Sequence, residues 1–383
     1  MKLPFQTDPF VAFRYELHRF PELSGQETQT QQRIRAFISL FDPADITPIG
    51  GTGLLVRYGT GTGTGGPVTL IRADIDALPI PETNTFAHQS RHERVSHKCG
   101  HDGHTAILVR LAASLHASPI ATGLVYLLFQ PAEETGEGAD LVLHDNAFRA
   151  LRPPDRVFAL HNLPGFAEGV IVCKPGLFTA SVSGMDIRFT GHVSHAAEPE
   201  NGNNPAYAMA EFVLQSRALQ QPDPQLDTFA LITPVQTTMS DWSYGVSPGT
   251  GQVHLTLRSR TPARMDDLKK QIGQLLDTLA DAHKLVIDST DVQPFYATEN
   301  DADAVDQIRN CAETLGFPYQ ELTQPFRWGE DFGLFTQHFR GAMFGIGAGE
   351  DSPALHNDDY DFNDNLIEPA ARLFRALIDL KHT

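Results

Sequence analysis

The order of predicted helices and strands is the feature that most constrains the fold of this chain. Up to about residue 178, helical apolar patterns alternate with short apolar strand patterns, which is typical of an α/β domain with helices packed on a central sheet. From about residue 179 the order changes to strand, helix, strand, strand, helix, strand. That order is characteristic of a ferredoxin-like unit. The sequence therefore predicts two different architectures in one chain.

The first pattern returns after the second one ends, so we interpret the ferredoxin-like block as an insertion. A predicted helix over Ala302–Leu315 and an amphipathic helix over Leu366–Leu380 resume the α/β alternation. A chain of 383 residues with 41% hydrophobic content is also too long for one compact core. We expect a discontinuous first domain over 1–178 and 292–383, with a central mixed sheet flanked by helices, and an inserted domain over 179–291.

Local signals predict several of the early elements. Asp8 followed by Pro9 favours the start of a helix, and Ser24 with Glu27 has the spacing of a capping box for a second helix. The glycine-rich run Gly59–Gly66 lies between two strand patterns. It lacks the Gly-Lys-Ser/Thr ending of a phosphate loop and opens no helix, so we predict a hairpin turn there. Beyond residue 102 the predicted order is a helix through Leu115, a strand over Leu124–Phe129, a helix from about Gly138 to Phe148 and a strand over Val157–Leu160.

Side chains that bind metals are concentrated in the run from His97 to His104, whose sequence is HKCGHDGH. Thiolate, imidazole and carboxylate groups bind borderline divalent cations, and a glycine on each side of His101 and Asp102 allows the backbone to curl tightly. The same residues also suit loop polar groups and a helix N-cap. Taken alone, the cluster therefore leaves both interpretations open.

Three further segments favour the metal interpretation, because each places a carboxylate or imidazole after an apolar run. Glu133 and Glu134 follow one predicted strand, His161 follows another, and His356 follows the apolar stretch 342–346. Ligands of α/β sheets bind at the carboxyl ends of the strands. We therefore expect these side chains to meet at one edge of the sheet.

Seven segments carry a resemblance that covers nearly the whole chain. In chain order they are Ile71–Pro79, Cys99–Asp102, Glu133–Glu134, His161, Gly191–Ala197, Glu330–Phe332 and Leu355–His356. Together they resemble the M20 metallopeptidase family, and within it the amidohydrolase branch of N-acyl-amino-acid, hippurate and auxin-conjugate hydrolases. The resemblance implies a metal-bearing catalytic domain and an inserted ferredoxin-like domain that acts as a lid or a dimerisation domain.

The resemblance also implies a site for two divalent metal ions per chain. Its ligand set falls on Cys99, His101, Glu134, His161 and His356, with Cys99 as the plausible bridge. Such a pair activates water and polarises a carbonyl. Zn²⁺ or Mn²⁺ is preferred, and Ni²⁺ and Co²⁺ are acceptable to the same ligand types.

Glu133 lies beside a ligand and is left for proton transfer, as general base and then general acid. The competing interpretation is a surface carboxylate at a strand end. Asp76, with Asp74 as a neighbour, resembles a carboxylate that orients a ligand imidazole, although plain strand-end polar groups explain both nearly as well. Asp102 and His104 suit either ligands or helix-start groups that brace the metal loop.

Two residues of the inserted domain complete the expected site. His195 resembles the lid histidine that reaches the substrate in M20 enzymes, where it would hydrogen-bond the developing oxyanion. Arg258 is a candidate clamp for a substrate carboxylate, because a guanidinium group matches a carboxylate in shape and charge. A solvated strand arginine explains Arg258 about as well.

We therefore expect a metal-dependent amidohydrolase that cleaves the amide of a small N-acylated amino acid or a related compound. A dipeptidase or other exopeptidase on the same scaffold is the nearer alternative. A metal-dependent protein that binds a small acid without turning it over is the more distant one. A homodimer or tetramer formed through the inserted domain is also compatible with the resemblance.

Composition excludes some partners. A formal net charge of −18 argues against binding to nucleic acid or to an anionic membrane surface, because phosphate binding relies on clustered Lys and Arg. The three cysteines are odd in number and widely spaced, so they do not predict a disulfide framework. The first residues lack the apolar core of a signal peptide and no stretch is long enough to span a bilayer. We expect a cytoplasmic protein with a small-molecule substrate.

Overall fold

The computed structural model describes residues 8–59, 65–223, 226–240 and 242–380, and it divides into two compact units. The first unit contains the residues up to 178, together with 298–323 and the residues from 331 onward. The second unit contains 179–297 and the short return 324–330. Position 291, the expected end of the insertion, falls inside the last strand of the second unit, which continues to Phe295 because it stays paired along the neighbouring strand.

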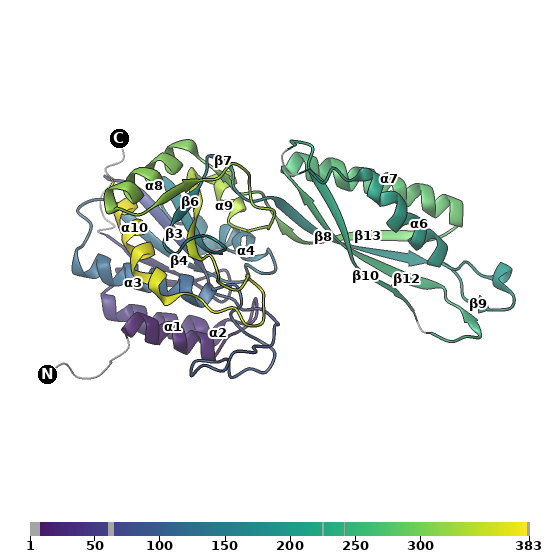
Figure 1. Ribbon diagram of the computed structural model, residues 1–383, viewed down its shortest axis with the longest axis horizontal. Coiled ribbons are helices and arrows are strands. Elements are labelled where there is room, and N and C mark those ends of the chain that lie inside the picture. Colours follow the sequence, from purple (N-terminus) through teal and green to yellow (C-terminus); the bar gives the residue numbers. More distant parts are fainter. Residues whose placement is uncertain (1–7, 60–64, 224–225, 241, 381–383) are drawn as a thin grey trace. The chain divides into compact units, whose positions relative to one another are not determined.

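The first unit is built on an eight-stranded mixed sheet (Figure 1). Its strands are β1 (Asp45–Ile49), β2 (Gly53–Tyr58), β3 (Val68–Asp74), β4 (Leu124–Gln130), β5 (Arg156–Pro164), β6 (Ile171–Cys173), β15 (Tyr319–Glu321) and β16 (Gly341–Gly349), in the spatial order β1-β2-β4-β3-β5-β16-β6-β15. The run β4-β3-β5-β16 is parallel, whereas β1, β2 and β6 make antiparallel pairs. Strands β3 and β4 are buried throughout, as expected for parallel strands with helices on both faces.

Helices cover both faces of this sheet. They are α1 (Pro9–Arg19), α2 (Thr28–Ile38), α3 (His101–Ala117), α4 (Gly138–His144), α5 (Asn146–Arg149), α8 (Ala302–Leu315), α9 (Gly333–His338) and α10 (Ile367–Asp379). Apolar side chains of α1, α2, α3, α8 and α10 share one core cluster with the strands. Figure 1 shows α4 and α9 on the side of the sheet opposite α3 and α10. A short pair, β7 (Gly176–Leu177) with β14 (Glu299–Asn300), completes the unit.

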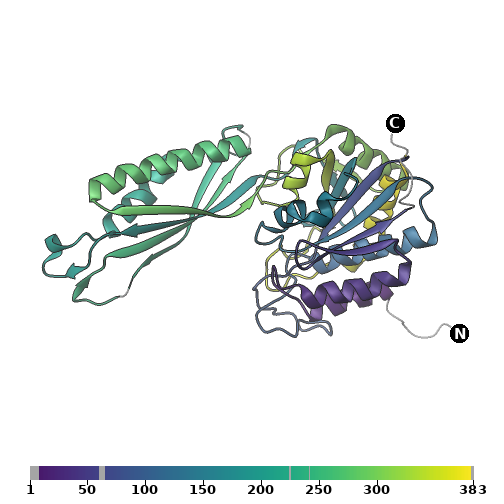
Figure 2. The same cartoon turned by 180° about the vertical axis from the view of Figure 1, so that it is seen from behind.

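The second unit has the β-α-β-β-α-β order that the sequence predicts. Its elements are β8 (Ser181–Thr190), α6 (Ala206–Ser216), β10 (Ala230–Met239), β12 (Thr250–Ser259), α7 (Pro262–His283) and β13 (Val286–Phe295), with a ribbon of β9 (Ser194–His195) and β11 (Val246–Ser247). The four long strands form an antiparallel sheet in the order β10-β12-β8-β13. Figure 2 shows the long helix α7 lying along this sheet. Apolar residues of α6 and α7 pack on one sheet face in a separate core.

Of two predictions about the start of the chain, one is confirmed and the other is wrong. Asp8 caps α1 as expected, because its carboxylate accepts a hydrogen bond from the backbone N–H of Phe10 at 2.8 Å. The capping box at Ser24 is wrong. Helix α2 begins at Thr28, and the carboxylate of Glu22 caps it by accepting the backbone N–H of Thr30 at 2.7 Å. A carboxylate farther upstream therefore performs the function expected of Ser24.

The hairpin predicted at Gly59–Gly66 is also wrong. Strand β4 lies between β2 and β3 in the sheet, antiparallel to β2 and parallel to β3, so those two strands are not neighbours. Residues 60–64 of the run lie outside the described residues. Both flanking strands are apolar and buried, and such strands carry little local information about which partner they will pair with.

The helix expected over 138–148 is divided into two short helices. Asp145 adopts an extended conformation between α4 and α5, and its carboxylate accepts hydrogen bonds from the backbone N–H groups of Ala147 and Gly50, at 2.8 and 2.9 Å. A short polar side chain that caps one helix and anchors a loop stabilises this break. Strand β5 is longer than predicted, so His161 lies within it. No helix in the described parts of the chain has both the length and the apolarity needed to cross a membrane.

Candidate metal centre

The site lies at the carboxyl ends of strands β3, β4, β5 and β16, where α/β sheets present their ligands. Strand β3 ends at Asp74, and the chain continues to Asp76 at the same edge. Both carboxylates are buried. A buried carboxylate must be paired or hydrogen-bonded to stay charged, so these two residues indicate a polar site rather than an ordinary strand end.

Cys99 and His101 reach the site through a tight turn at the start of α3. Gly100 is the N-cap residue and has a left-handed conformation with φ of 95°. A Cβ atom at this position would lie 2.6 Å from the side-chain oxygen of Asn162, which is the residue after His161 in β5. Glycine is therefore required both by the left-handed backbone and by the close approach of Asn162. Because glycine has no side chain, the Cys99 loop can lie close to the strand that carries His161.

Glu133 and Glu134 follow β4 in a turn of unusual geometry. Ala132 has a positive φ of 53°, and its backbone N–H is held by the buried carboxylate of Glu27 at 2.8 Å. The backbone N–H of Gly138 donates to the carbonyl of Ala132 at 3.0 Å. A strained alanine persists only where its surroundings hold it, so these contacts position the two glutamates.

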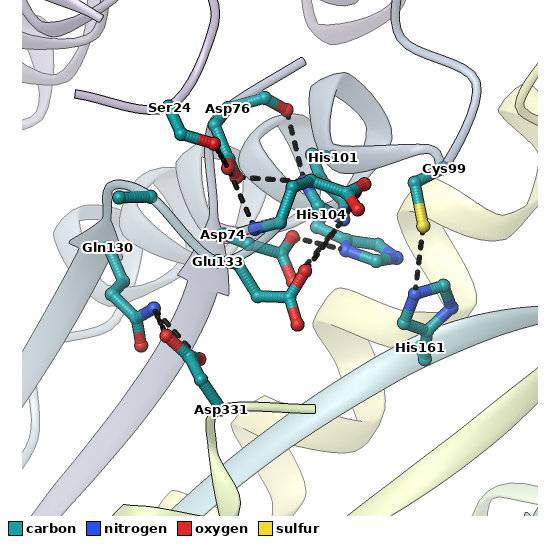
Figure 3. A network of polar contacts seen from close by, with 12 residues as sticks. Ser24, Asp74, Asp76, Cys99, His101, His104, Gln130, Glu133, His161 and Asp331 are labelled. Carbon is teal, nitrogen blue, oxygen red and sulfur yellow. Dashed lines mark hydrogen bonds and ion pairs between the residues drawn. The ribbon is translucent and has the colours of Figure 1, made fainter. Parts of the chain in front are cut away.

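The six residues predicted from sequence as ligands or general base lie together at this edge. In each of three groups of residues, the ligand atoms lie within 4.8 Å of one another. The groups are Cys99 with His101 and His161, Cys99 with Glu134 and His356, and His101 with Glu133 and Glu134. Figure 3 shows Cys99 and His161 facing each other beside His101 and Glu133. Cys99, His101 and Glu134 each belong to two of these groups, so the groups overlap in one cluster of candidate ligand atoms.

The distances between candidate ligand atoms are close to those expected for two donors on one metal ion. Cys99 Sγ lies 3.4 Å from His161 Nε2, and Glu134 Oε1 lies 3.7 Å from His101 Nε2 and 3.8 Å from His356 Nε2. Two donors on one tetrahedral Zn²⁺ are about 3.4–3.6 Å apart, given the usual bond lengths. Within the described residues, His101 Nε2 and Glu134 Oε1 are buried without a hydrogen-bond partner. A bound cation would satisfy both atoms.

Asp76 forms hydrogen bonds with two of the predicted ligand residues. His101 Nδ1 lies 3.0 Å from the carbonyl oxygen of Asp76 and 3.1 Å from its carboxylate, which leaves Nε2 directed toward the site. The other carboxylate oxygen of Asp76 accepts hydrogen bonds from the Ser24 hydroxyl and from the backbone N–H of Glu134, at 2.7 and 2.9 Å. One carboxylate therefore holds two of the predicted ligand residues, as partners behind a metal ligand commonly do.

The pKa values of Glu134 and His101 are both raised, which indicates that the site lacks positive charge. Burial raises the pKa of Glu134 to about 8, together with the nearby carboxylates of Asp76 and Asp74 and against the charge of His101. Burial would lower the pKa of His101, but the carboxylates of Asp74, Asp76 and Glu134 raise it to about 10. Protons on these groups supply charge that a divalent cation would otherwise provide. Metal binding here would therefore displace protons.

The remaining imidazoles favour the neutral state, in which histidine binds metals. Burial lowers the pKa of His161 well below its usual range, and the neighbouring His104 adds to the effect. Partial burial also lowers the pKa of His356, with a contribution from His101. His161 Nδ1 donates to the carbonyl of Asn162 at 2.9 Å, so Nε2 carries the lone pair that faces Cys99.

Asp74 and His104 form a hydrogen-bonded network next to the candidate ligands. His104 Nδ1 contacts the Asp74 carboxylate at 2.6 Å, and His104 Nε2 contacts the side-chain oxygen of Asn162 at 2.5 Å. Both ring nitrogens are therefore occupied by protein groups. Asp74 also pairs with buried Arg72, which reaches Asp331 on its other side, with both contacts at 2.7 Å. Figure 3 shows Asp331 hydrogen-bonded to Gln130, the last residue of β4.

Asp102, which the sequence offered as a group that braces the Cys99 loop, belongs to a buried charged cluster whose other members were not predicted as part of the site. Asp102 accepts from Arg14 at 3.1 Å and from His18 at 2.8 Å, and the other ring nitrogen of His18 meets Glu82 at 2.9 Å. Lys98 contacts the same Glu82 oxygen at 2.5 Å. Charged residues on a buried helix face were the available signal, but Arg14 and Asp102 are 88 positions apart in sequence.

His97 has a different environment from its neighbours. It is 2% exposed, and neither ring nitrogen has a hydrogen-bond partner within the described part of the chain. Burial lowers the pKa of His97 to about 4, so the ring is neutral at physiological pH.

His195 and Arg258 belong to the second unit. His195 is exposed in β9, which pairs with β11, and its Nδ1 accepts the backbone N–H of Ala197 at 3.1 Å. Arg258 lies on β12 and donates to the carbonyl of Arg327 at 2.6 Å. Burial lowers its pKa. Their roles at the metal centre remain predictions.

Two curated proteins are similar to this chain over nearly its whole length. A curated hippurate hydrolase from Campylobacter jejuni is 30% identical over 374 residues, which covers 96% of this chain and 95% of that protein. An N-acetyldiaminopimelate deacetylase from Listeria monocytogenes is 30% identical over 360 residues, covering 91% of this chain and 92% of that protein.

Solved structures show the same fold. The Bacillus subtilis YXEP protein, described as a dinuclear metal binding peptidase from the M20 family, superposes with a TM-score of 0.80 at 24% identity, covering 97% of this chain and 96% of that one. A putative aminohydrolase from methicillin-resistant Staphylococcus aureus gives a TM-score of 0.84 at 23% identity, with the same coverage of both chains.

Residues 70–380 match the sequence model of one family, peptidase family M20/M25/M40. This range includes every candidate ligand from Cys99 to His356, and it spans both units. With full-length relatives at 30% identity, the match shows that this chain is a member of peptidase family M20/M25/M40.

Proposed function

We propose that this protein hydrolyses the amide bond of a small N-acylated amino acid or a related amide, with two divalent metal ions as cofactors. The observation that carries the proposal is the meeting of one thiol, three imidazoles and two carboxylates from four separate segments at one sheet edge. The names of the two curated relatives support a substrate with an N-acyl group. Membership of an amide-hydrolysing family supports the reaction type.

An amide resists hydrolysis because water is a poor nucleophile at neutral pH and the leaving amine must be protonated. When bound, a pair of divalent ions supplies an activated water and polarises the substrate carbonyl. The residues proposed to hold the pair are Cys99, His101, Glu134, His161 and His356. The family resemblance assigns the shared position to the Cys99 thiolate, which belongs to two of the groups of ligand atoms, as His101 and Glu134 also do.

Glu133 is the proposed general base and acid. Its side chain is 7% exposed, and its carboxylate lies 4.0 Å from His101 Nε2, so it borders the ligand atoms. From that position it would take a proton from the attacking water and return it to the leaving nitrogen. Proton transfer of this kind typically contributes about 10²–10⁴ in rate.

The second unit is proposed to act as a lid that supplies His195 and Arg258. His195 is exposed, and its Nε2 is the ring nitrogen that the Ala197 contact leaves for a substrate oxyanion. Arg258 keeps a guanidinium edge beyond its contact with the Arg327 carbonyl, and that edge suits a substrate carboxylate. These assignments rest on the resemblance and on accessibility.

We also propose an assembly through the second unit, as a homodimer or tetramer. Strand β10 is an edge strand, and beside it an apolar groove of about 490 Å³ runs along α6, lined by Met209, Val213, Leu214 and Met239 among others. An open strand edge next to an apolar helix face favours pairing with a second copy of the chain. A Leu214→Glu variant should reduce the mass measured by light scattering to that of one chain.

The native metal and the cellular location are finer proposals. We propose Zn²⁺ or Mn²⁺, with Ni²⁺ and Co²⁺ as acceptable substitutes, because the donor set mixes thiolate, imidazole and carboxylate. We propose a cytoplasmic location, because three widely spaced cysteines, an odd number, do not predict a disulfide framework. A small molecule, rather than nucleic acid or a membrane, is the proposed partner.

The central test is metal content measured on protein purified without chelator, together with turnover of N-acetyl, N-benzoyl and dipeptide substrates. About two ions per chain with chelator-sensitive hydrolysis of the N-acyl substrates is expected. Preferred hydrolysis of dipeptides would assign an exopeptidase instead. Binding of metal without turnover of any substrate would assign a binding protein.

The ligand set has its own test. Cys99→Ala should lower the metal content, because it removes the shared thiolate. Cys311→Ala is the matched control, since Cys311 is a buried thiol of α8 that packs in the apolar core. Unchanged metal stoichiometry in Cys99→Ala would remove the thiolate from the ligand set.

A further inference from the structure

Lys98 lies in one loop that carries candidate metal ligands and contacts a second such loop, although its side chain has no role in the proposed reaction. Its backbone oxygen accepts the N–H of His356 at 2.7 Å, and its ammonium donates to the carbonyl of Tyr360 at 2.8 Å. Lys98 precedes Cys99 in the chain and is wholly buried. It therefore joins the first ligand loop to both ends of the segment 356–360.

His356 depends on such contacts more than the other ligand residues do. Its side chain is 51% exposed, whereas that of His101 is 0% exposed and that of Glu134 is 12% exposed. Surrounding side chains therefore do little to fix the position of the His356 ring. Its backbone is also left-handed, with φ of 67°, which a residue with a side chain adopts only when its surroundings hold it.

The ammonium of Lys98 is itself held by a carboxylate. Glu82 accepts from Lys98 at 2.5 Å, and it also contacts His18 at 2.9 Å and accepts the backbone N–H of Ser90 at 2.6 Å. Burial would raise the pKa of Glu82, but its bonds to His18 and Lys98 lower it to about 2. Glu82 is therefore charged at neutral pH, and the buried Lys98 has the counterion it needs.

The far end of the segment has one more anchor. The hydroxyl of Tyr360 accepts from the side-chain amide of Asn162 at 2.5 Å, and Asn162 follows the ligand residue His161. The segment 356–360 is thus tied to the Cys99 loop by Lys98 and to β5 by Asn162. Three segments that carry candidate ligands meet in this set of contacts.

We propose that Lys98 is a positioning residue that holds the segment 356–360 against the Cys99 loop and thereby sets the affinity of the metal position that includes His356. The proposal rests on the proposed function, because it takes His356 as a ligand. Lys98 acts through the backbone of the segment. It is assigned neither as a metal ligand nor as a substrate-binding group.

The test compares Lys98→Met with a matched control, Lys174→Met. Lys174 also donates from its ammonium to two backbone carbonyls, those of Pro175 and Leu177 at 2.9 and 2.8 Å, but outside the candidate site. The double variant Lys98→Met/Glu82→Gln covers the case in which Lys98→Met fails to fold, because it leaves no unpaired buried charge.

Two measurements follow on each protein. Hydrogen exchange on the metal-free proteins should show faster exchange in the peptide containing His356 when Lys98 is replaced, and no change in Lys174→Met. Competition with a chromophoric chelator should show one of two Zn²⁺ ions bound about 10–100-fold more weakly, with the other unchanged, as is usual for loss of a partner behind a metal ligand.

The outcomes separate this proposal from the proposed function. Wild-type protein that binds two Zn²⁺ while the Lys98 variants bind both equally well would overturn the role of Lys98 alone. An equal loss of both ions in the variants would also overturn it, because the effect would then be general. Wild-type protein that binds no Zn²⁺ would overturn the ligand assignment, and this proposal with it.

Discussion

The candidate residues of the two units differ in how their positions are determined. In the first unit, His101 and His161 are buried and hydrogen-bonded on the side away from the site. In the second unit, His195 is exposed on a two-stranded ribbon, and Arg258 donates to a single backbone carbonyl, that of Arg327. These two candidate ligands are therefore pre-organised by packing, whereas the two candidate residues of the second unit would gain their main partner when substrate binds.

The difference between the two units predicts that the largest loss of activity follows replacement of a residue of the first unit. Glu133→Ala should lower kcat by about 10²–10⁴ because it removes the proton carrier, while the metal content stays the same. Steady-state kinetics and metal analysis on the same sample provide the measurement. Glu137→Ala, an exposed glutamate near the same turn, is the control and should keep full activity. Retained turnover in Glu133→Ala would rule out its assignment as the base.

Replacing the candidate catalytic residue of the second unit should lower kcat without changing the metal affinity. His195→Ala should reduce kcat by about 10²–10³ if its ring donates to an oxyanion, and metal affinity should be unchanged. His192→Ala, an exposed histidine close by, serves as the control. A His195→Ala protein with wild-type kcat would remove the second unit from the chemistry and break the comparison.

The buried cluster of the first unit predicts a pH effect on stability. Burial alone would lower the pKa of His18, but the carboxylates of Asp102 and Glu82 raise it to about 9 from the usual 6.5. Because the folded-state pKa is the higher one, the stabilisation is fully present below about pH 6.5 and is lost as pH rises through about 9. The full effect is about 3 kcal/mol of unfolding free energy.

Urea unfolding of metal-free protein between pH 6 and pH 10 would measure this effect. The His18→Gln variant should be less stable at pH 6 and should show a flatter profile over the alkaline range. A wild-type profile as flat as that of the variant would show that His18 is not held in its charged form.

The smallest expected effect concerns substrate binding in the second unit. Arg258→Met should raise KM by about 10–100-fold for N-acyl amino acids, because a charged hydrogen bond contributes about 1.5–3 kcal/mol. The matching amides, which lack the carboxylate, should show little change. Arg188→Met on the neighbouring strand β8 is the control. An equal rise in KM for acids and amides would exclude a carboxylate clamp.

Elements with strong local signals could be predicted from sequence. Asp8 and Pro9 indicated the start of α1, and the changed order of elements after residue 179 indicated the ferredoxin-like unit. The strand pairing around residues 59–66 could not be predicted in the same way. The pairing of β4 between β2 and β3 depends on contacts between distant segments, and three apolar buried strands offer no local signal for their order.

Some residues of the candidate site could likewise be predicted from sequence, and others could not. Cys99, His101 and Glu134 stand out because their residue types and spacing suit metal binding, and the structure brings them together. The supporting cluster does not stand out. Arg14 and Glu82 look like ordinary surface residues in the sequence, and Ser24 looked like a helix cap, yet its hydroxyl binds Asp76.

The sequence by itself determined the types of ligand, the order in which they occur and the alternation of elements that delivers them to strand ends. Those properties follow from local chemistry and periodicity, which each segment carries independently. Only the tertiary structure decided which buried charges pair, as in Arg14 with Asp102, and which backbone groups hold His356. Burial makes an unpaired charge costly, but the partner that satisfies it is chosen by the packing of segments far apart in the chain.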